Sequence, residues 1–178
     1  MELIEGIKTR RSIRNFNDKD IDINLVKEIV NITQSSPSWK NTQTVRYNYI
    51  SDKNEILDIS NQCGSDWNKN IISKAKGVMI LSTINKISGY EKDGTPSTSK
   101  GSHFESFDAG IYANTFVLAC HNYGIGTVIM GIFDEEKIKK IINLPKEESI
   151  SCIIPMGYYD EKPVSPRKKL SEDVLRIK

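Results

Sequence analysis

Apolar residues recur at helical spacing in five parts of the chain, with polar turns between them. The spacing predicts a short first helix, beginning near Leu3, that Arg10–Arg14 closes. A second helix, capped by Asp22, is expected to stop near Ser35–Pro37, because the residue before a proline is pushed out of the helical region. Three further helices are predicted: one around Ile56–Ile59, one over Glu105–Tyr123 that is apolar nearly all round, and one that Asp134 caps and that ends before Pro145.

Four other segments have the composition of β-strands. Val45–Ile50 is rich in aromatic and β-branched residues, and Gly77–Thr83 is a continuous apolar run typical of a buried central strand. Gly126–Gly131 predicts a strand and a turn. Ile150–Gly157 predicts the last core strand, in which Pro155 indicates an edge or a bulge. These elements fit an α+β fold, and the absence of a repeat or linker predicts a single domain over residues 1–178.

Two stretches lack a periodic pattern. Asn85–His103 is polar and contains three glycines and a proline, and a loop of this length inside a compact domain is usually functional or disordered. We interpret it as a mobile lid or a substrate-side loop. Tyr158–Lys178 is charged and has too few apolar residues for a core of its own, so we expect this tail to wrap around a neighbouring chain.

Composition excludes several classes of protein. The 178 residues are enough for a sizeable core, and a net charge of +2 from 25 basic and 23 acidic side chains argues against a nucleic-acid partner. The three cysteines and two histidines show no metal-ligand spacing, so we expect reduced cysteines and no metal. With no apolar run of about 20 residues and no signal-like N-terminus, we expect a cytoplasmic protein that does not bind membranes.

Three short polar segments are the candidates for chemistry. Arg10–Arg14 holds three arginines, and on a helix Arg10 and Arg14 would share one face and repel each other. A phosphate among them would explain the cluster, because the guanidinium fork matches its oxygens two at a time. Pro37–Asn41 follows the second helix, and Pro166–Lys169 lies near the C-terminus. Each segment alone is typical of a solvated face, a turn or a charged tail, so the indication comes from their combination.

The glycines at Gly124 and Gly126 do not form a dinucleotide-binding motif. That motif requires a third glycine three positions later and a helix after it, whereas here the third glycine is Gly131 and a strand follows. A helix C-cap followed by a strand entry is the better interpretation.

Taken together, the three polar segments resemble the FMN-dependent nitroreductase family, in particular its small single-domain members. Arg10–Phe16 matches the Arg-Arg-Ser-x-Arg-x-Phe stretch that follows the first helix in that family. Pro37–Gln43 matches Pro-Ser-x-x-Asn-x-Gln after the second helix, and Pro166–Lys168 matches the closing Pro-Arg-Lys. Further matches over the chain are the Gly-x-Gly at Gly124 and Gly126, Leu144–Pro145, and Gly157–Tyr158; Thr44–Val45 departs from the Pro-Trp of many members.

The resemblance implies a central, mostly antiparallel sheet flanked by helices, in an intertwined homodimer with exchanged C-terminal tails. It also implies an FMN site shared by two chains. The residues implied to hold the phosphate and ribityl chain are Arg10, Ser12, Arg14, Arg167 and Lys169, with Arg11 beside them; those implied to come from the partner chain are Pro37, Ser38 and Asn41. The backbone around Met130 and Gly131 would lie by flavin N5 and O4, and Asn68 or Asn70 is the candidate for another ring contact, although loop asparagines are more often simple surface residues.

The function that the resemblance implies is an FMN oxidoreductase working by a ping-pong mechanism. NAD(P)H would reduce the flavin, and a small-molecule acceptor such as a nitroaromatic or a quinone would oxidise it, without a catalytic side chain. Two alternatives stay open. One is a different redox reaction on the same scaffold, such as dehalogenation or ring oxidation, with the Asn85–His103 loop deciding. The other is a flavin- or anion-binding protein without turnover.

Overall fold

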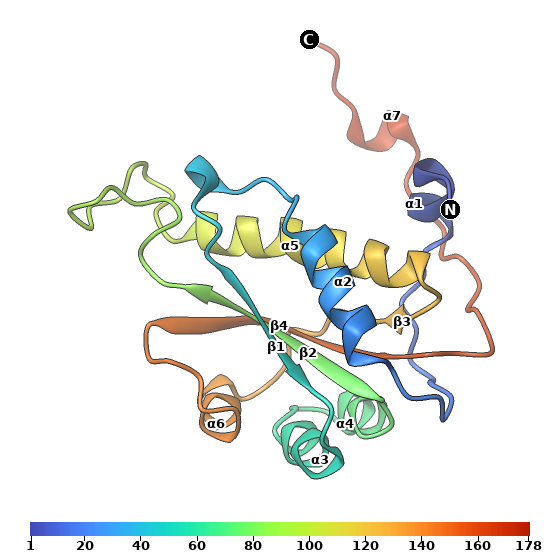
Figure 1. Ribbon diagram of the computed structural model, residues 1–178. Coiled ribbons are helices and arrows are strands. Elements are labelled where there is room, and N and C mark those ends of the chain that lie inside the picture. The colour runs from blue at the N-terminus through green and yellow to red at the C-terminus, as the bar shows by residue number, and fades with distance from the viewer.

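A four-stranded antiparallel sheet lies at the centre of the computed structural model, which describes all residues 1–178 (Figure 1). The strands follow the order β1-β2-β4-β3, with bounds Val45–Ile50 for β1, Gly77–Ile84 for β2, Gly126–Thr127 for β3 and Glu148–Gly157 for β4. All neighbouring pairs are antiparallel. The expected α+β class and antiparallel sheet are therefore confirmed.

Helices cover both faces of the sheet (Figure 1). One face packs against α2 (Ile23–Thr33) and the long α5 (His103–Asn122), and the other against α3 (Lys53–Asn61), α4 (Asp66–Ile72) and α6 (Glu135–Ile141). Strand β2 shows why a continuously apolar strand fits here: Met79 and Leu81 belong to the first core, whereas Val78 and Ile80 belong to the second. Successive side chains point to opposite faces, so a strand covered on both sides is apolar at consecutive positions, here from Val78 to Leu81.

Side-chain caps start two of the five predicted helices at the residues expected from the sequence. Asp22 Oδ1 accepts from Asn24 N at 2.9 Å, and Asp134 Oδ1 accepts from Lys137 N at 3.2 Å. Gly124, with φ of 73°, follows the C-terminus of α5 as expected. Helix α4 was not predicted, because its seven residues are largely polar and too few to show a clear period.

The arginine segment does not close the first helix, contrary to expectation. Helix α1 (Leu3–Thr9) ends before it, and the next residues run as an extended chain beside β3, with Ile13 N donating to the Thr127 carbonyl at 2.9 Å. In an extended chain alternate side chains point the same way, so Arg10, Ser12 and Arg14 share one side. Ile13 is only 2% exposed and faces the core. The argument from a shared helical face was therefore wrong.

Pro155 does not mark an edge strand, because β4 pairs with β2 on one side and with β3 on the other. The irregularity in β4 lies at Ser151, where the register with β2 shifts. The Pro155 carbonyl accepts from Val128 N at 3.4 Å, just beyond the end of the two-residue β3. The missing N–H of the proline thus faces the side where β3 has already ended, so no ladder hydrogen bond is lost.

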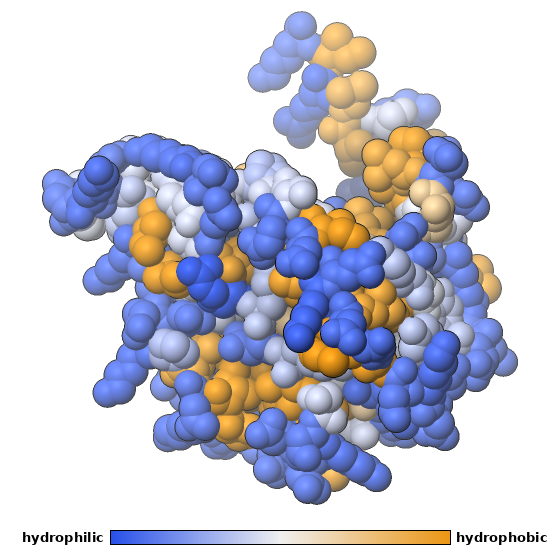
Figure 2. All heavy atoms as spheres, viewed as in Figure 1, coloured by the Kyte–Doolittle hydropathy of each residue, from blue (hydrophilic) through white to orange (hydrophobic).

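The C-terminal segment projects from the rest of the molecule and contains the short α7 (Ser171–Val174) (Figure 1). It carries exposed apolar residues, which Figure 2 shows in orange on the projecting part: Leu170, Val174, Leu175 and Ile177, the last 91% exposed. The loop between β2 and α5 is irregular, as expected, apart from a bridge between Tyr90 and Pro96. None of the helices combines the length and the apolar content that a membrane span requires.

Replacing Gly126 by alanine is expected to loosen the arginine segment from the sheet. A Cβ at this position would lie 2.7 Å from Ile13 side-chain atoms and 2.7 Å from Tyr159 Cδ1, so the backbones must separate. We expect Gly126→Ala to lower the free energy of unfolding by about 1–3 kcal/mol in urea denaturation. Gly110→Ala is the control, because a Cβ there meets no atom within 4 Å. Equal stability of the two variants would contradict the close-packing argument.

Candidate functional site

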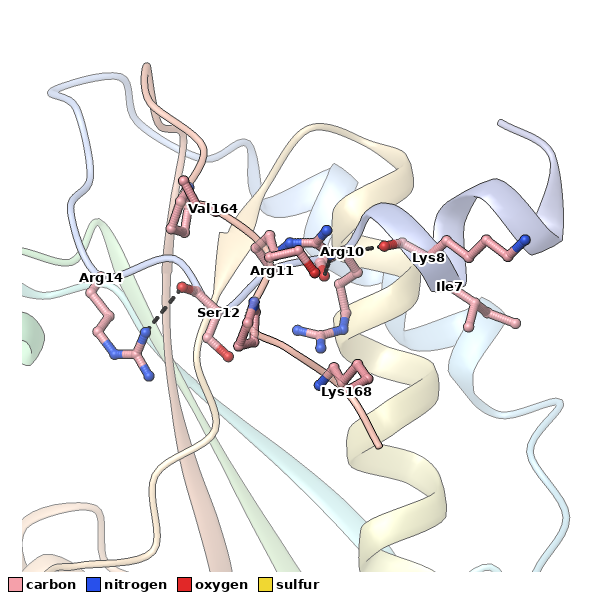
Figure 3. A pocket seen from close by; sticks show the side chains of 11 residues that line it. Ile7, Lys8, Arg10, Arg11, Ser12, Arg14, Val164 and Lys168 are labelled. Atoms are coloured by element: carbon pink, nitrogen blue, oxygen red, sulfur yellow. Dashed lines mark hydrogen bonds between the residues drawn. The ribbon is translucent and has the colours of Figure 1, made fainter. Parts of the chain in front are cut away.

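A basic pocket of about 460 Å³ lies between the extended arginine segment and the C-terminal tail (Figure 3). Its lining includes five basic side chains and no carboxylate; the basic residues are Lys8, Arg10, Arg11, Arg14 and Lys168. Ser12 adds a hydroxyl between the arginines. Such a concentration of like charge in one hollow favours an anion with several oxygens.

The guanidinium groups of this pocket have no carboxylate partner within the chain. No arginine takes part in an ion pair. Arg11 Nη1 donates to the carbonyls of Lys8 and Arg10 at 2.8 and 2.7 Å, whereas its Nε is buried without a partner. Arg14 Nη1 reaches only the Ser12 carbonyl at 3.3 Å. Arg10 makes no side-chain hydrogen bond, and in Figure 3 its guanidinium lies beside Lys168. Most donors of the cluster are thus free for a ligand.

A second hollow, of about 310 Å³, adjoins the first and shares Ser12 and Arg14 with it. Helix α4 contributes Trp67 and Asn70 to its lining. Of the two asparagines considered from the sequence, Asn70 therefore lies beside the arginine segment, whereas Asn68 lies outside both hollows, its backbone N–H held by Ser65 Oγ. The sequence offered no way to choose between them, since α4 itself was not predicted.

Met130 and Gly131 follow the end of β3 by three and four residues. Met130 N donates to the Ile153 carbonyl at 2.8 Å, so its amide is already engaged. Gly131 is exposed, its N–H makes no hydrogen bond within the chain, and a Cβ there would meet nothing within 4 Å. Ser12 forms a β-bridge with Thr127. Gly131 follows Thr127 by four residues, so the backbone of Gly131 lies at most about 14 Å from that of Thr127. Gly131 is thus the free donor of the pair.

The Pro37–Asn41 segment lies far from the basic pocket within one chain. Trp39 N donates to Asp108, near the start of α5, whereas Thr9 Oγ1, next to the arginines, lies 3.0 Å from His121 Nε2 near its end. The thirteen residues between Asp108 and His121 correspond to about 20 Å of helix. Pro37, Ser38 and Asn41 are therefore not brought together with the arginines in this chain.

The tail contributes five residues to the lining of the pocket: Pro163, Val164, Ser165, Pro166 and Lys168. Arg167 and Lys169 do not line it. Lys168 is a pocket residue that the sequence analysis included in its motif but did not assign to the phosphate. The motif itself carries no signal that separates Lys168 from its neighbours, because the path of the tail decides which of its residues meet the pocket.

The basic cluster also acts on His121. Burial is the main cause that lowers the pKa of this imidazole, and the positive charges of Lys162, Arg10 and Arg11 lower it further. Thr9 Oγ1 donates its only proton to the Glu5 carbonyl at 2.8 Å, so the contact with His121 is a donation from Nε2–H. The pKa of His121 therefore reports the positive potential of the pocket.

Comparison with known proteins gives consistent matches over most of the chain. The family model described as Nitroreductase family matches residues 7–158. The chain is 23% identical to the Iodotyrosine dehalogenase 1 homolog of Caenorhabditis elegans over 195 residues, covering 97% of this chain and 60% of that protein. It is 26% identical to the FMN reductase (NAD(P)H) of Bacillus subtilis strain 168 over 157 residues, covering 82% of this chain and 61% of that protein.

The chain thus spans about three fifths of the length of both curated relatives. Among solved structures, a nitroreductase family protein from Streptococcus pneumoniae TIGR4 superposes with a TM-score of 0.88 at 20% identity, covering 99% of this chain and all of that one. At this identity the superposition shows a shared fold.

The titration of His121 tests the potential of the pocket. We expect its NMR midpoint below the ordinary 6.5, and a rise toward 6.5 when inorganic phosphate neutralises the arginines. Because the folded pKa is depressed, the folded state binds fewer protons, and this contribution to stability is present above pH 6.5 and is lost as pH falls below it. His121→Gln assigns the signal against His103. A midpoint at or above 6.5 without phosphate would contradict the prediction.

Proposed function

Because this chain belongs to the nitroreductase family, we propose that it is an FMN-dependent oxidoreductase. It would take electrons from NAD(P)H and pass them to a nitroaromatic or quinone-type acceptor in a ping-pong cycle. The observation that carries the proposal is the pocket with five basic side chains and no carboxylate. The name of the Bacillus subtilis relative, an FMN reductase that uses NAD(P)H, supports the same cofactor and donor.

The residues of the pocket fit the terminal phosphate of FMN. A phosphate monoester carries about two negative charges and three acceptor oxygens, which unpaired guanidiniums can bind two at a time. Arg10, Arg14 and Lys168 would hold it, and the Ser12 hydroxyl would donate between them. The orphaned Nε of Arg11 lies in the same lining and would gain a partner.

Bound FMN would supply the acceptance and donation of hydride at N5. This chain would supply position and electrostatics. The free N–H of Gly131 is the donor suited to the N5 and O4 edge, since the Met130 amide is already bonded to Ile153. Asn70, which lines the adjoining hollow with Arg14, would contact the ring on the side of α4. The proposal needs no side-chain acid or base.

A complete site would need a second copy of the chain. The resemblance assigns contacts with the ribityl group to both the arginines and Ser38, but in one chain the two segments contact α5 at positions about 20 Å apart along the helix. The projecting tail carries apolar residues that nothing in its own chain covers, which is costly in water. We therefore propose a homodimer in which Pro37, Ser38 and Asn41 of one chain complete the pocket of the other.

Reductive dehalogenation is the second candidate function, since the Caenorhabditis elegans relative that covers 97% of this chain is named an iodotyrosine dehalogenase homolog. It would use the same cofactor pocket and differ on the acceptor side, where the Asn85–His103 loop lies. An acceptor screen separates the two: nitroaromatics and quinones against halogenated tyrosines, each added to the reduced enzyme.

The visible absorption spectrum tests the proposal most directly. We expect the purified protein to show bound flavin, and the flavin band to bleach on anaerobic addition of NADH or NADPH. An oxidised spectrum that persists would favour a flavin-binding protein without this turnover. A colourless protein that takes up no added FMN would exclude the flavin assignment.

Removing two charges from the pocket tests the assignment of the phosphate. We expect Arg10→Ala/Arg14→Ala to lose FMN by at least about tenfold in affinity, because each charge-assisted hydrogen bond contributes about 1.5–3 kcal/mol. Lys53→Ala/Lys74→Ala removes the same charge from a pocket that has no residue in common with the basic pocket and should retain FMN. Tight FMN binding by the arginine variant would overturn the assignment.

Mixing the variants tests the shared site. A chain carrying Arg10→Ala/Arg14→Ala and a chain carrying Ser38→Ala/Asn41→Ala each lack one half of every site. In a mixed dimer one site regains both halves and the other loses both. Recovery of FMN binding on refolding the mixture is the expected result, and no recovery would contradict a site made by two chains.

A further inference from the structure

The turn from Ser38 to Gln43 holds an unfavourable backbone conformation. Lys40, Asn41 and Gln43 have φ of 46°, 56° and 51°, in the left-handed region that residues with a Cβ rarely adopt. Three such residues within four positions persist only where the surroundings fix them. Within the turn, Ser38 Oγ accepts from Gln43 N at 3.0 Å. The turn also holds backbone bonds from Asn41 N to the Ser38 carbonyl and from Thr42 N to the Trp39 carbonyl, and further support comes from outside it.

A buried carboxyl group on α5 provides that support. Trp39 N lies 3.1 Å from both carboxyl oxygens of Asp108, which is 1% exposed and takes part in no ion pair. A buried carboxyl without a cation is costly unless hydrogen bonds satisfy it. The buried carboxyl of Asp108 therefore requires its hydrogen-bond donors, and the Trp39 N–H of the turn is one of them.

The other donor to Asp108 comes from the loop between β2 and α5. Ser88 Oγ donates to Asp108 Oδ2 at 2.7 Å, and Ser88 is fully buried. Two further contacts join the turn to this region: Lys40 Nζ pairs with Glu91 at 3.0 Å, and the Trp39 ring packs on Phe104 with 4.2 Å between centroids. The turn and the loop meet at the same end of α5 (Figure 1).

We propose that Asp108 is a positioning residue that couples the Asn85–His103 loop to the Pro37–Gln43 turn. This inference rests on the proposed function, in which the turn contacts FMN and the loop faces the acceptor. If either segment moves, it must break its hydrogen bond to Asp108 and leave a buried polar group unpaired, or take the other segment with it. Retention of the cofactor and binding of the acceptor are therefore linked, and each strengthens the other to the same extent.

Ser88→Ala is the informative variant, because it removes the loop's bond to Asp108 and leaves every residue of the turn unsubstituted. We expect it to speed FMN dissociation about 5- to 30-fold and to raise the acceptor KM. Asp108→Ala, which removes both acceptor oxygens, should have at least as large an effect. Adding Ser88→Ala to Asp108→Ala should change FMN dissociation no further, since the bond between the two side chains is already absent.

Asp58→Ala is the matched control, an exposed carboxylate on α3 that makes no side-chain hydrogen bond. It should leave FMN dissociation unchanged. Unchanged dissociation in Ser88→Ala, or additive effects of the two substitutions, would overturn the coupling.

A measurement without flavin keeps this test separate from the proposed function. The chain has two tryptophans, so Trp67→Phe leaves Trp39 as the sole reporter of the turn. In that background, Ser88→Ala and Asp108→Ala should each shift the Trp39 emission to the red as the turn loosens from α5. No shift with Ser88→Ala would overturn the coupling. If the wild-type chain binds no FMN but the substitutions still shift the Trp39 emission, the proposed function is overturned and the coupling of turn and loop is supported.

Discussion

The backbone hydrogen bond from Ile13 N to the Thr127 carbonyl is the contact on which the basic pocket depends. It fixes an extended segment beside β3, and Gly126 lets the two chains approach more closely than a Cβ would permit. Burial of Ile13 then turns Ser12 and Arg14 outward. On a free segment the like charges of the arginines would repel and separate. Pairing of the segment with β3 holds them close together in spite of this repulsion.

Helix α5 gives the molecule its second constraint. It is buried against the sheet and α2 over much of its length, and it separates two groups of polar residues. Near its start, Asp108 gathers the turn after α2 and the loop before α5. Near its end, His121 lies in the field of the arginines. A rigid helix of this length keeps the two groups apart in one chain, and the proposed dimer follows from that separation rather than from any single contact.

Much of the fold could be predicted from the sequence, because local patterns specify local structure. The strand Val45–Ile50 has the bounds expected from its β-branched and aromatic residues, and Asp22 and Asp134 cap the helices assigned to them. The failures share a cause. The arginine segment was given helical geometry because it continues from α1, and its pairing with β3 is a long-range contact that no local pattern encodes. Pro155 was taken to indicate an edge or a bulge for the same reason, since strand order and register are properties of the whole sheet.

For the site, the sequence by itself determined which residue types are present: arginines suited to a phosphate, a polar turn, and a basic motif near the C-terminus. Only the tertiary structure decided which of them meet. It brought Lys168 rather than Arg167 or Lys169 to the pocket, placed Asn70 rather than Asn68 beside Arg14, and left the Gly131 amide free while engaging that of Met130. It also joined Asp108 to two loops that no sequence pattern connects. Composition and periodicity act over a few residues, whereas the direction of a side chain is set by backbone hydrogen bonds to distant strands.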